Sequence, residues 1–303
     1  MGVSPWLRRL AWATLVANCL LVVTGGAVRL TGSGLGCPTW PRCTDSSFTP
    51  HGEIGPHQLV EFGNRTLTFV LVAIAVATFV VARQDARRLG RPDLLRLAIV
   101  LALAIPAQAV LGGITVLSDL NPWVVSLHLV LSLAIVSLAV VLLDRLDHPP
   151  TAPARGVVPT LAWTTYGVAW LVLYAGTVVT GAGPHAGDAS SPRNELDPLQ
   201  ISQLHADLVF LLIGLTVGMW FLTRATGGDT RPALALLAVE ASQAVVGYIQ
   251  YFAGLPVAVV LLHMLGASLV MATTTWLLVS ALHPPDDPDP WPVEGIHTRG
   301  VHW

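Results

Sequence analysis

Residues 123–143 read WVVSLHLVLSLAIVSLAVVLL, and His128 is the only ionisable side chain among them. A helix needs about 20 mostly apolar residues to cross the hydrocarbon core of a bilayer, and this run reaches that length. A surface helix of a soluble protein would instead carry charged residues along one face. The stretch therefore predicts a transmembrane helix with one polar side chain, which is costly inside a membrane and usually faces the protein interior.

Similar apolar runs fill most of the 303-residue chain, and only 11% of its residues are charged. Soluble domains contain roughly a quarter charged residues. The net charge of −2 also offers no basic surface for nucleic acid. We therefore predict an all-α integral membrane protein in a lipid bilayer. Its eight transmembrane helices are expected at about residues 10–30, 60–82, 94–116, 123–143, 157–181, 201–223, 232–252 and 256–280.

Basic residues gather in alternate loops. Twelve of the 16 lie on the side that holds both termini, and four lie in the opposite loops or at the adjoining helix mouths. The positive-inside rule then places both termini in the cytoplasm, and the loops at 31–58 and 182–200 outside the cell membrane. The first apolar run is interpreted as a transmembrane helix, because no cleavage site of small residues follows it.

Residues 283–303 are rich in proline and aspartate. A segment of this composition buries too little apolar surface to fold, so we expect a disordered cytoplasmic tail. His283, His297 and His302 are expected to be solvated there.

The two halves of the chain resemble each other at a constant interval. A shift of 135 residues relates Gln108–Gly112 to Gln243–Gly247, and His128 to His263. Each half holds four expected spans, so both halves start on the same side of the membrane and the repeat is parallel. We predict two pseudo-symmetric four-helix bundles, an N-terminal one at residues 1–147 and a C-terminal one at 156–282.

Three histidines, His128, His205 and His263, lie one or two turns from the extracytoplasmic ends of expected helices. Helices two apart in a four-helix bundle face each other across the core, so His205 and His263 could bind one haem iron from opposite sides. Zinc is a weaker alternative, because no third and fourth nitrogen or sulfur ligands accompany the pair. A single histidine at a helix mouth can also be an interfacial polar residue.

The first half lacks a second histidine at the matching position, where Asn64 stands opposite His205. Asparagine is a poor iron ligand, and His57, about two turns earlier, is the other candidate. We expect His128 to bind the iron of a haem held in this half, with an open position on the other side. Such an arrangement would suit a bound substrate better than a fixed electron carrier.

His57, Glu61, Asn64 and Arg65 share one face of the second expected helix. Glu61 is interpreted as a carboxylate that handles protons beside a haem, and Arg65 as a partner for a haem propionate. The alternative is an interfacial salt pair worth a few tenths of a kcal/mol. A further acid, Glu240 in the seventh span, would either relay protons or extend toward the membrane surface.

Cys37 and Cys43 lie in the first extracytoplasmic loop, within GCPTWPRC at residues 36–43. That compartment is oxidising, so a disulfide is expected. The loop is short, so the bridge would be exposed and could be structural or redox-active; free thiols are the third alternative. A Cys-x-x-Cys-His motif is absent, so any bound haem would be held without covalent attachment.

The loop TGSGLGCPTWPRC at residues 31–43 resembles that of the haem A synthase family. Glu61 with Arg65, the segment GGITV at 112–116 and the three helix-mouth histidines match the same family, over all eight helices. The resemblance implies a C-terminal bundle that holds haem b through His205 and His263. It also implies an N-terminal bundle that binds the substrate haem O at His128, with Glu61 as the catalytic acidic residue.

The reaction implied by this resemblance oxidises a methyl group of haem O to a formyl group by successive hydroxylations, which gives haem A for terminal oxidase assembly. Implied partners are a haem O synthase that supplies the substrate, an electron donor such as a quinol, and terminal oxidase assembly factors. Family members often carry histidine where Asn64 stands, so a bis-histidine N-terminal site is not implied. The single cysteine pair is similar to that of the subgroup with one pair.

Two other functions remain open from the residues alone. A membrane b-type cytochrome that only passes electrons would share the histidines but would have no use for Glu61. A haem transporter or chaperone would hold haem loosely in both halves.

Overall fold

The computed structural model describes residues 2–50, 55–185 and 187–283 of the chain. Within these ranges the chain forms eight helices and no strand, and each helix is long and apolar enough to cross a membrane. This confirms the predicted fold class. In chain order the helices are α1 (Pro5–Leu30), α2 (Pro56–Leu89), α3 (Pro92–Leu117), α4 (Pro122–Asp147), α5 (Val157–Ala182), α6 (Pro198–Ala225), α7 (Arg231–Phe252) and α8 (Val257–Leu282). The expected disordered tail beyond residue 283, with His297 and His302, lies outside the described residues.

Proline residues mark where most of the helices begin. Six of the eight helices carry proline at their first or second position, where the missing N–H would have no partner within the helix. Three of these starts are also capped by a side chain that accepts a backbone hydrogen bond from the first turn, namely Ser4, Asn121 and Asp197. Gly90 ends α2 at a φ of 66°, a left-handed conformation that suits glycine.

The observed helices are longer than the predicted spans. Helix α2 runs for 34 residues, and its last turn carries Arg87 and Arg88. An apolar run reveals only the part of a helix that lies in hydrocarbon, whereas the hydrogen-bonded helix can continue into the polar headgroup region. Asp85 near this end accepts hydrogen bonds from Arg88 and from the backbone N–H of Ser4, which ties α2 to the start of α1.

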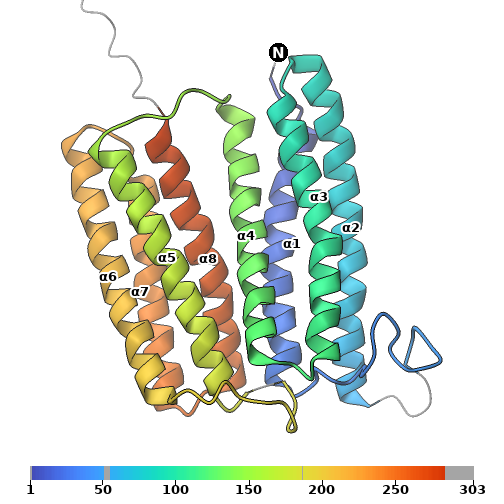
Figure 1. Ribbon diagram of the computed structural model, residues 1–303. Coiled ribbons are helices and arrows are strands. Elements are labelled where there is room, and N and C mark those ends of the chain that lie inside the picture. Colours follow the sequence, from blue (N-terminus) through green and yellow to red (C-terminus); the bar gives the residue numbers. More distant parts are fainter. Residues whose placement is uncertain (1, 51–54, 186, 284–303) are drawn as a thin grey trace, which may run out of the picture.

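The helices form two groups of four (Figure 1), with α1–α4 on one side and α5–α8 on the other. Within each group, every helix packs against its neighbours in sequence, and the first packs against the fourth. Between the groups, α4 packs against α8, α1 against α8, and α4 against α5. The internal repeat relates α1 to α5 and α4 to α8. A twofold axis beside the α4–α8 contact makes the α1–α8 contact equivalent to the α5–α4 contact, which is the pattern observed.

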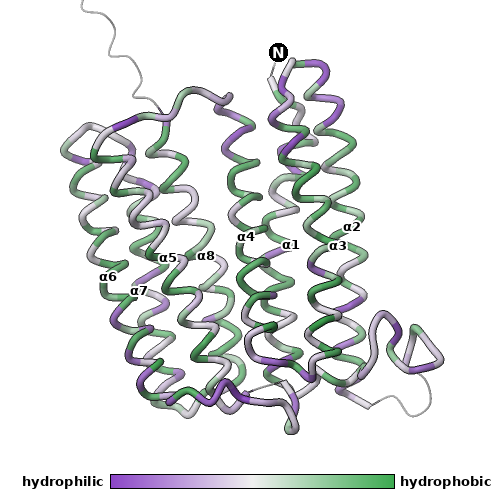
Figure 2. The backbone as a smooth tube through the Cα atoms, in the orientation of Figure 1, coloured by the Kyte–Doolittle hydropathy of each residue, from purple (hydrophilic) through white to green (hydrophobic). Residues whose placement is uncertain are grey.

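An apolar core fills the contact between the two groups. Leu15 of α1, Val136 of α4, Leu173 of α5 and Met271 of α8 are all buried in one cluster. The hydroxyl groups of Thr275 and Ser137 are hydrogen-bonded across this contact at 3.0 Å. Large apolar side chains also remain exposed on the outer helix faces, as expected for a surface against lipid. Figure 2 shows hydrophilic residues mainly at the helix ends and in the loops.

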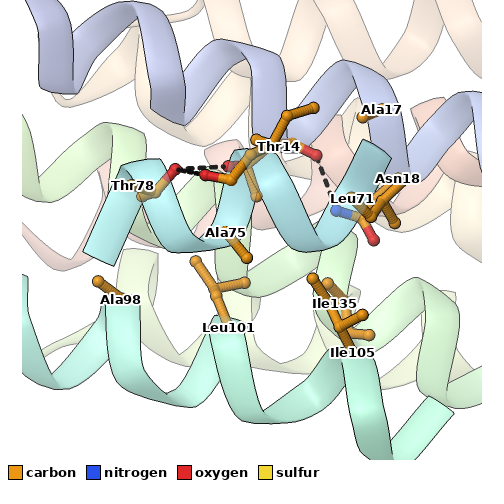
Figure 3. Close-up of a pocket in the computed structure, with 11 residues that line it drawn as sticks. Thr14, Ala17, Asn18, Leu71, Ala75, Thr78, Ala98, Leu101, Ile105 and Ile135 are labelled. Atoms are coloured by element: carbon orange, nitrogen blue, oxygen red, sulfur yellow. Dashed lines mark hydrogen bonds between the residues drawn. The ribbon is translucent and has the colours of Figure 1, made fainter. Parts of the chain in front are cut away.

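A small cavity lies between helices α1, α2 and α3 (Figure 3), where Thr14 and Thr78 place their hydroxyl groups 3.3 Å apart. Asn18 lies beside them and donates to the carbonyl of Thr14 at 2.8 Å. The centre of a water molecule could occupy about 10 Å³ of this cavity. This volume is close to the minimum that one bound water requires. The cavity therefore fits a single water rather than a cofactor.

Candidate functional site

His205 in α6 and His263 in α8 face each other inside the C-terminal group of helices. Their ring centroids are 6.5 Å apart and their planes are inclined at 81°. Two imidazoles that bind one metal ion from opposite sides, with bonds of about 2 Å, have centroids roughly 6 Å apart. The spacing between the two rings therefore has the size that one shared metal ion requires.

Each of these rings lies against a glycine of a neighbouring helix. A Cβ atom added at Gly176 in α5 would lie 3.2 Å from Cε1 of His205, and one added at Gly247 in α7 would lie 3.8 Å from Cε1 of His263. The Nδ1 atom of His205 lies 3.0 Å from the carbonyl oxygen of Val172. A carbonyl oxygen can only accept, so Nδ1 carries the hydrogen and the lone pair of Nε2 is left for a ligand.

His263 has a buried Nδ1 atom without a hydrogen-bond partner among the described residues. A buried nitrogen without a partner is costly unless a ligand or water satisfies the ring. The pair thus offers a fixed imidazole from α6 and an incompletely satisfied one from α8. This donor set fits a haem iron, because imidazole nitrogens are established axial ligands of haem.

His128 in α4 repeats the surroundings of His263 in the N-terminal group. Its ring lies against Gly112 of α3, where an added Cβ would be 3.3 Å from Cε1. Its Nδ1 atom is likewise buried and without a partner in the described part of the chain. Since the shift of 135 residues relates both the histidines and their glycines, the repeat extends from the sequence to the packing of the imidazole rings.

Asn64 and His57 lie on α2 and are both engaged in local contacts. The side-chain oxygen of Asn64 accepts a hydrogen bond from the hydroxyl of Thr24 in α1 at 2.8 Å. His57 is exposed at the start of α2, and its Nδ1 lies 3.0 Å from the hydroxyl oxygen of Ser33. These contacts use Asn64 for helix packing and His57 for anchoring the loop between α1 and α2.

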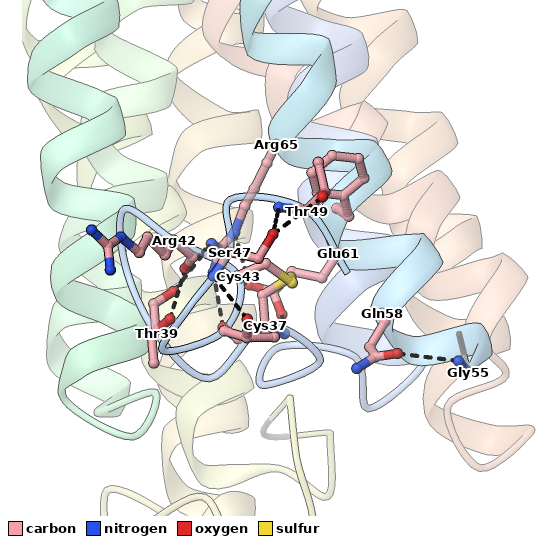
Figure 4. The surroundings of a disulfide bond; sticks show 12 residues. Cys37, Thr39, Arg42, Cys43, Ser47, Thr49, Gly55, Gln58, Glu61 and Arg65 are labelled. Carbon is pink, nitrogen blue, oxygen red and sulfur yellow. Dashed lines mark hydrogen bonds and ion pairs between the residues drawn. A yellow bond between two sulfur atoms is a disulfide. The ribbon is translucent and has the colours of Figure 1, made fainter. Parts of the chain in front are cut away.

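Glu61 is buried at the mouth of α2, with 4% of its surface exposed. One carboxylate oxygen accepts the backbone N–H of Cys37 at 2.5 Å. The other accepts two hydrogen bonds from Arg65, from Nε at 3.1 Å and from Nη2 at 2.5 Å. The carboxylate is therefore held in one position by the loop on one side and by the next turn of its own helix on the other (Figure 4).

Arg65 completes this arrangement by binding the same loop. Its Nη1 donates to the carbonyls of Thr39 and Arg42 at 3.1 and 3.2 Å, and its Nη2 donates to the carbonyl of Cys37 at 2.9 Å. Together with the two bonds to Glu61, these contacts occupy all five N–H groups of the guanidinium. In this arrangement Arg65 has no donor left for a haem propionate, so that predicted contact would require the loop to move.

The loop held by Glu61 and Arg65 contains a disulfide between Cys37 and Cys43, with a Cα–Cα distance of 4.4 Å. The predicted bridge is present, but the expectation that it would be exposed is wrong, because both cysteines are 0% exposed. The loop folds down onto α3, where a Cβ at Gly113 would overlap the indole ring of Trp40. The loop thus packs against α2 and α3 at this end of the N-terminal group of helices.

Glu240 is buried in α7 and accepts a hydrogen bond from the hydroxyl of Thr216 at 2.9 Å. It does not extend toward the membrane surface, so that alternative is wrong. Its second carboxylate oxygen has no partner in the described ranges, and the same is true of the side-chain oxygens of Gln243 and Gln250. These residues share one face of α7 with Gly247, the glycine beneath His263. A polar stripe therefore runs along α7 toward the histidine pair.

Two arginines near the loop between α5 and α6 were not singled out from the sequence. Arg29 of α1 donates to the carbonyls of His185 and Thr180 at 2.8 and 3.2 Å, which joins the two groups of helices at this end. Arg193 donates to the carbonyl of Pro184 at 2.7 Å, while its Nη1 is buried without a partner in the described chain. Unlike Arg65, Arg193 has a donor available for an anion.

Comparison with known proteins gives one family and several curated relatives. The family model COX15-CtaA, described as cytochrome oxidase assembly protein, matches residues 8–197. A protein named "Heme A synthase" from Lysinibacillus sphaericus (strain C3-41) is 32% identical over 184 residues, which cover 58% of this chain and 58% of the relative. The "Heme A synthase" of Geobacillus thermodenitrificans is 32% identical over 118 residues, or 39% and 35% of the two chains. That of Listeria welshimeri is 31% identical over 129 residues, or 40% of each chain.

The chain therefore spans less than two thirds of the length of these relatives. The family match includes Glu61, Arg65 and His128, and it ends before His205 and His263. The interpretation of those two histidines thus rests on their geometry and on the internal repeat.

Proposed function

The chain belongs to the family of cytochrome oxidase assembly proteins, and from this membership we propose that it is a multi-pass membrane oxidoreductase that converts haem O into haem A. Relatives named "Heme A synthase" support this reaction. The observation that carries the proposal is the His205–His263 pair, whose 6.5 Å spacing suits one iron, in a molecule that also holds a buried carboxylate at Glu61.

In this proposal His205 and His263 hold a haem b in the C-terminal group of helices. A haem held by both of these histidines would supply one-electron transfer rather than substrate chemistry. The hydrogen bond from His205 to Val172 fixes the orientation of one imidazole. Arg193 would be free to bind a propionate where Arg65 is not, because one of its buried nitrogen atoms lacks a partner among the described residues.

The N-terminal group of helices would bind the substrate haem O, with His128 toward its iron. Glu61 would then accept protons at the edge of the substrate, from a position fixed by Cys37 and Arg65. Asn64 stands at the position that matches His205, so this group of helices would hold a haem through fewer histidines, which suits a group that must arrive and leave. The loop of residues 31–50 packs against α2 and α3 at this end and would exclude water from the reacting edge.

The distribution of arginine supports an orientation with both termini in the cytoplasm and both haem sites near the extracytoplasmic face of the cell membrane. Haem O would come from a haem O synthase, electrons from a donor such as a quinol, and haem A would go to terminal oxidase assembly factors. These partners follow from the proposed reaction.

The test is extraction and mass analysis of the haems that the purified protein contains, from cells that make haem O. We expect haem A in the wild type, and haem O or a hydroxylated haem in Glu61→Ala and Glu61→Gln. Glu61→Gln is needed beside Glu61→Ala because it keeps the size of the side chain and an oxygen that can accept from Arg65, while its NH₂ group cannot accept the N–H of Cys37. Asp85→Asn is the matched control, a buried acid changed at the other end of the same helix.

Unchanged haem A in both Glu61 variants would remove Glu61 from catalysis. A wild-type protein that binds only haem b and never alters haem O would favour the electron-passing cytochrome instead. Loss of all haem during purification would favour a transporter or chaperone, because a bis-histidine haem should be retained.

A further inference from the structure

We infer that Asp144, His148 and His283 form a binding site for one divalent transition-metal ion, such as Zn²⁺, between the two groups of helices. Asp144 and His148 are four residues apart at the end of α4, and His283 directly follows α8. The site lies at the opposite end of the helices from the disulfide loop and Glu61, so it is separate from the proposed haem chemistry.

The imidazole rings of His148 and His283 both approach one carboxylate oxygen of Asp144. Nδ1 of His148 lies 3.2 Å from Oδ1 of Asp144, and Nε2 of His283 lies 3.1 Å from the same atom. One ligand atom from each residue falls within 4.8 Å of the other two. Zinc binds nitrogen and carboxylate oxygen at about 2.0–2.2 Å, so ligands around one ion lie roughly 3–3.5 Å apart. The two nitrogen–oxygen distances already have this value.

The internal repeat explains why two histidines meet here. His148 and His283 are related by the same shift of 135 residues as His128 and His263. Each is the first residue after its helix, and α4 packs against α8 beside the axis of the repeat. Equivalent residues near such an axis come together, and the two imidazole centroids are 4.0 Å apart. The expectation that His283 would be solvated is therefore wrong.

The charge of Asp144 also favours a cation at this position. Its side chain is 8% exposed, and its ion-pair partners among the described residues are the two imidazoles alone. Three other acids at this end of the molecule, Asp85, Asp93 and Asp147, each pair with an arginine. Two imidazole rings and one carboxylate are also the ligand set of many metal sites.

The exposure of the cluster allows an ion to enter and keep water ligands. The side chain of His148 is 53% exposed and that of His283 is 26% exposed, above the buried carboxylate. Three protein ligands leave at least one position for water, as in open zinc sites. The linker after α4 is also fixed here, because the N–H of Ala154 donates to the carbonyl of Leu282 at 3.0 Å. A bound ion would tie the ends of α4 and α8 together (Figure 1).

The experiment is a titration of purified full-length protein in detergent with ZnCl₂, after treatment with EDTA, followed by calorimetry and metal analysis. We expect one saturable Zn²⁺ per chain and a higher thermal unfolding temperature with Zn²⁺. Loss of an outer-shell partner weakens metal affinity about 10–100-fold, so loss of a direct ligand in His148→Ala or His283→Ala should cost at least about 10-fold.

The matched control is the double variant His297→Ala, His302→Ala, which removes the two histidines later in the sequence than His283 and should keep the Zn²⁺ site. His148→Ala changes a largely exposed side chain, and an unchanged haem spectrum would show that this variant is folded. Equal Zn²⁺ binding by His148→Ala, His283→Ala and wild type would overturn the inference. Loss of Zn²⁺ binding in the control variant would also overturn the inference. The absence of saturable Zn²⁺ binding in the wild type would do the same, and the three residues would then be a hydrogen-bonded His–Asp–His cluster.

Discussion

A methyl group added at Gly176 would lie 3.2 Å from Cε1 of His205, closer than the 3.4–4 Å of ordinary contacts. The imidazole cannot move away freely, because its Nδ1 is bonded to the carbonyl of Val172 on the same helix as Gly176. Overpacking of this kind costs about 1–3 kcal/mol. If the strain is relieved by moving the ring off its ligand position, Gly176→Ala should weaken haem binding about 5- to 140-fold, since 1.4 kcal/mol is a factor of ten.

Gly247→Ala provides the matched control for this prediction. A methyl group there would lie 3.8 Å from Cε1 of His263, which is an ordinary contact. Both changes replace glycine by alanine within a helix and gain about 1 kcal/mol of helix propensity, so loss of helix stability cannot explain a difference between them. The assay is haem content per protein after purification, with the absorption spectrum of the reduced and oxidised haem. Equal haem retention by both variants, or a greater loss in Gly247→Ala, would refute the reasoning.

Two further predictions concern buried hydrogen bonds. Arg65→Lys replaces the five-donor guanidinium that binds Glu61 and the loop carbonyls, and should destabilise the loop by about 1–3 kcal/mol. We expect proteolysis within residues 31–50 to be faster in this variant than in Arg42→Lys, which changes an exposed side chain. Equal rates of proteolysis in the two variants would contradict the prediction. Thr216→Val removes the hydroxyl that Glu240 accepts from and should lower the free energy of unfolding by about 1–3 kcal/mol. The control is Thr274→Val, because the buried hydroxyl of Thr274 donates only to a backbone carbonyl. Thermal unfolding should show a smaller loss of stability for this variant than for Thr216→Val. An equal loss of stability would argue against a role for the Thr216–Glu240 bond.

Features that depend on neighbours in the sequence could be predicted from it. Apolar runs gave the number of helices, because hydrocarbon thickness sets the length of a span. Prolines and capping residues stand at the helix starts, since the first turn needs no N–H from proline and accepts a side-chain cap. The shift of 135 residues indicated the repeat, and with it the matching positions of His128 and His263.

The partners of the polar side chains were decided only by the tertiary structure. Arg65 could equally have faced a propionate, but three of its five donors bind loop carbonyls 23 to 28 residues earlier in the chain, and the other two bind Glu61. His283 follows the last helix and meets His148 only because α4 and α8 pack together. A hydrogen bond depends on the direction and distance of both groups. Periodicity in the sequence fixes which face of a helix a residue occupies, and the packing of distant segments fixes what that face meets.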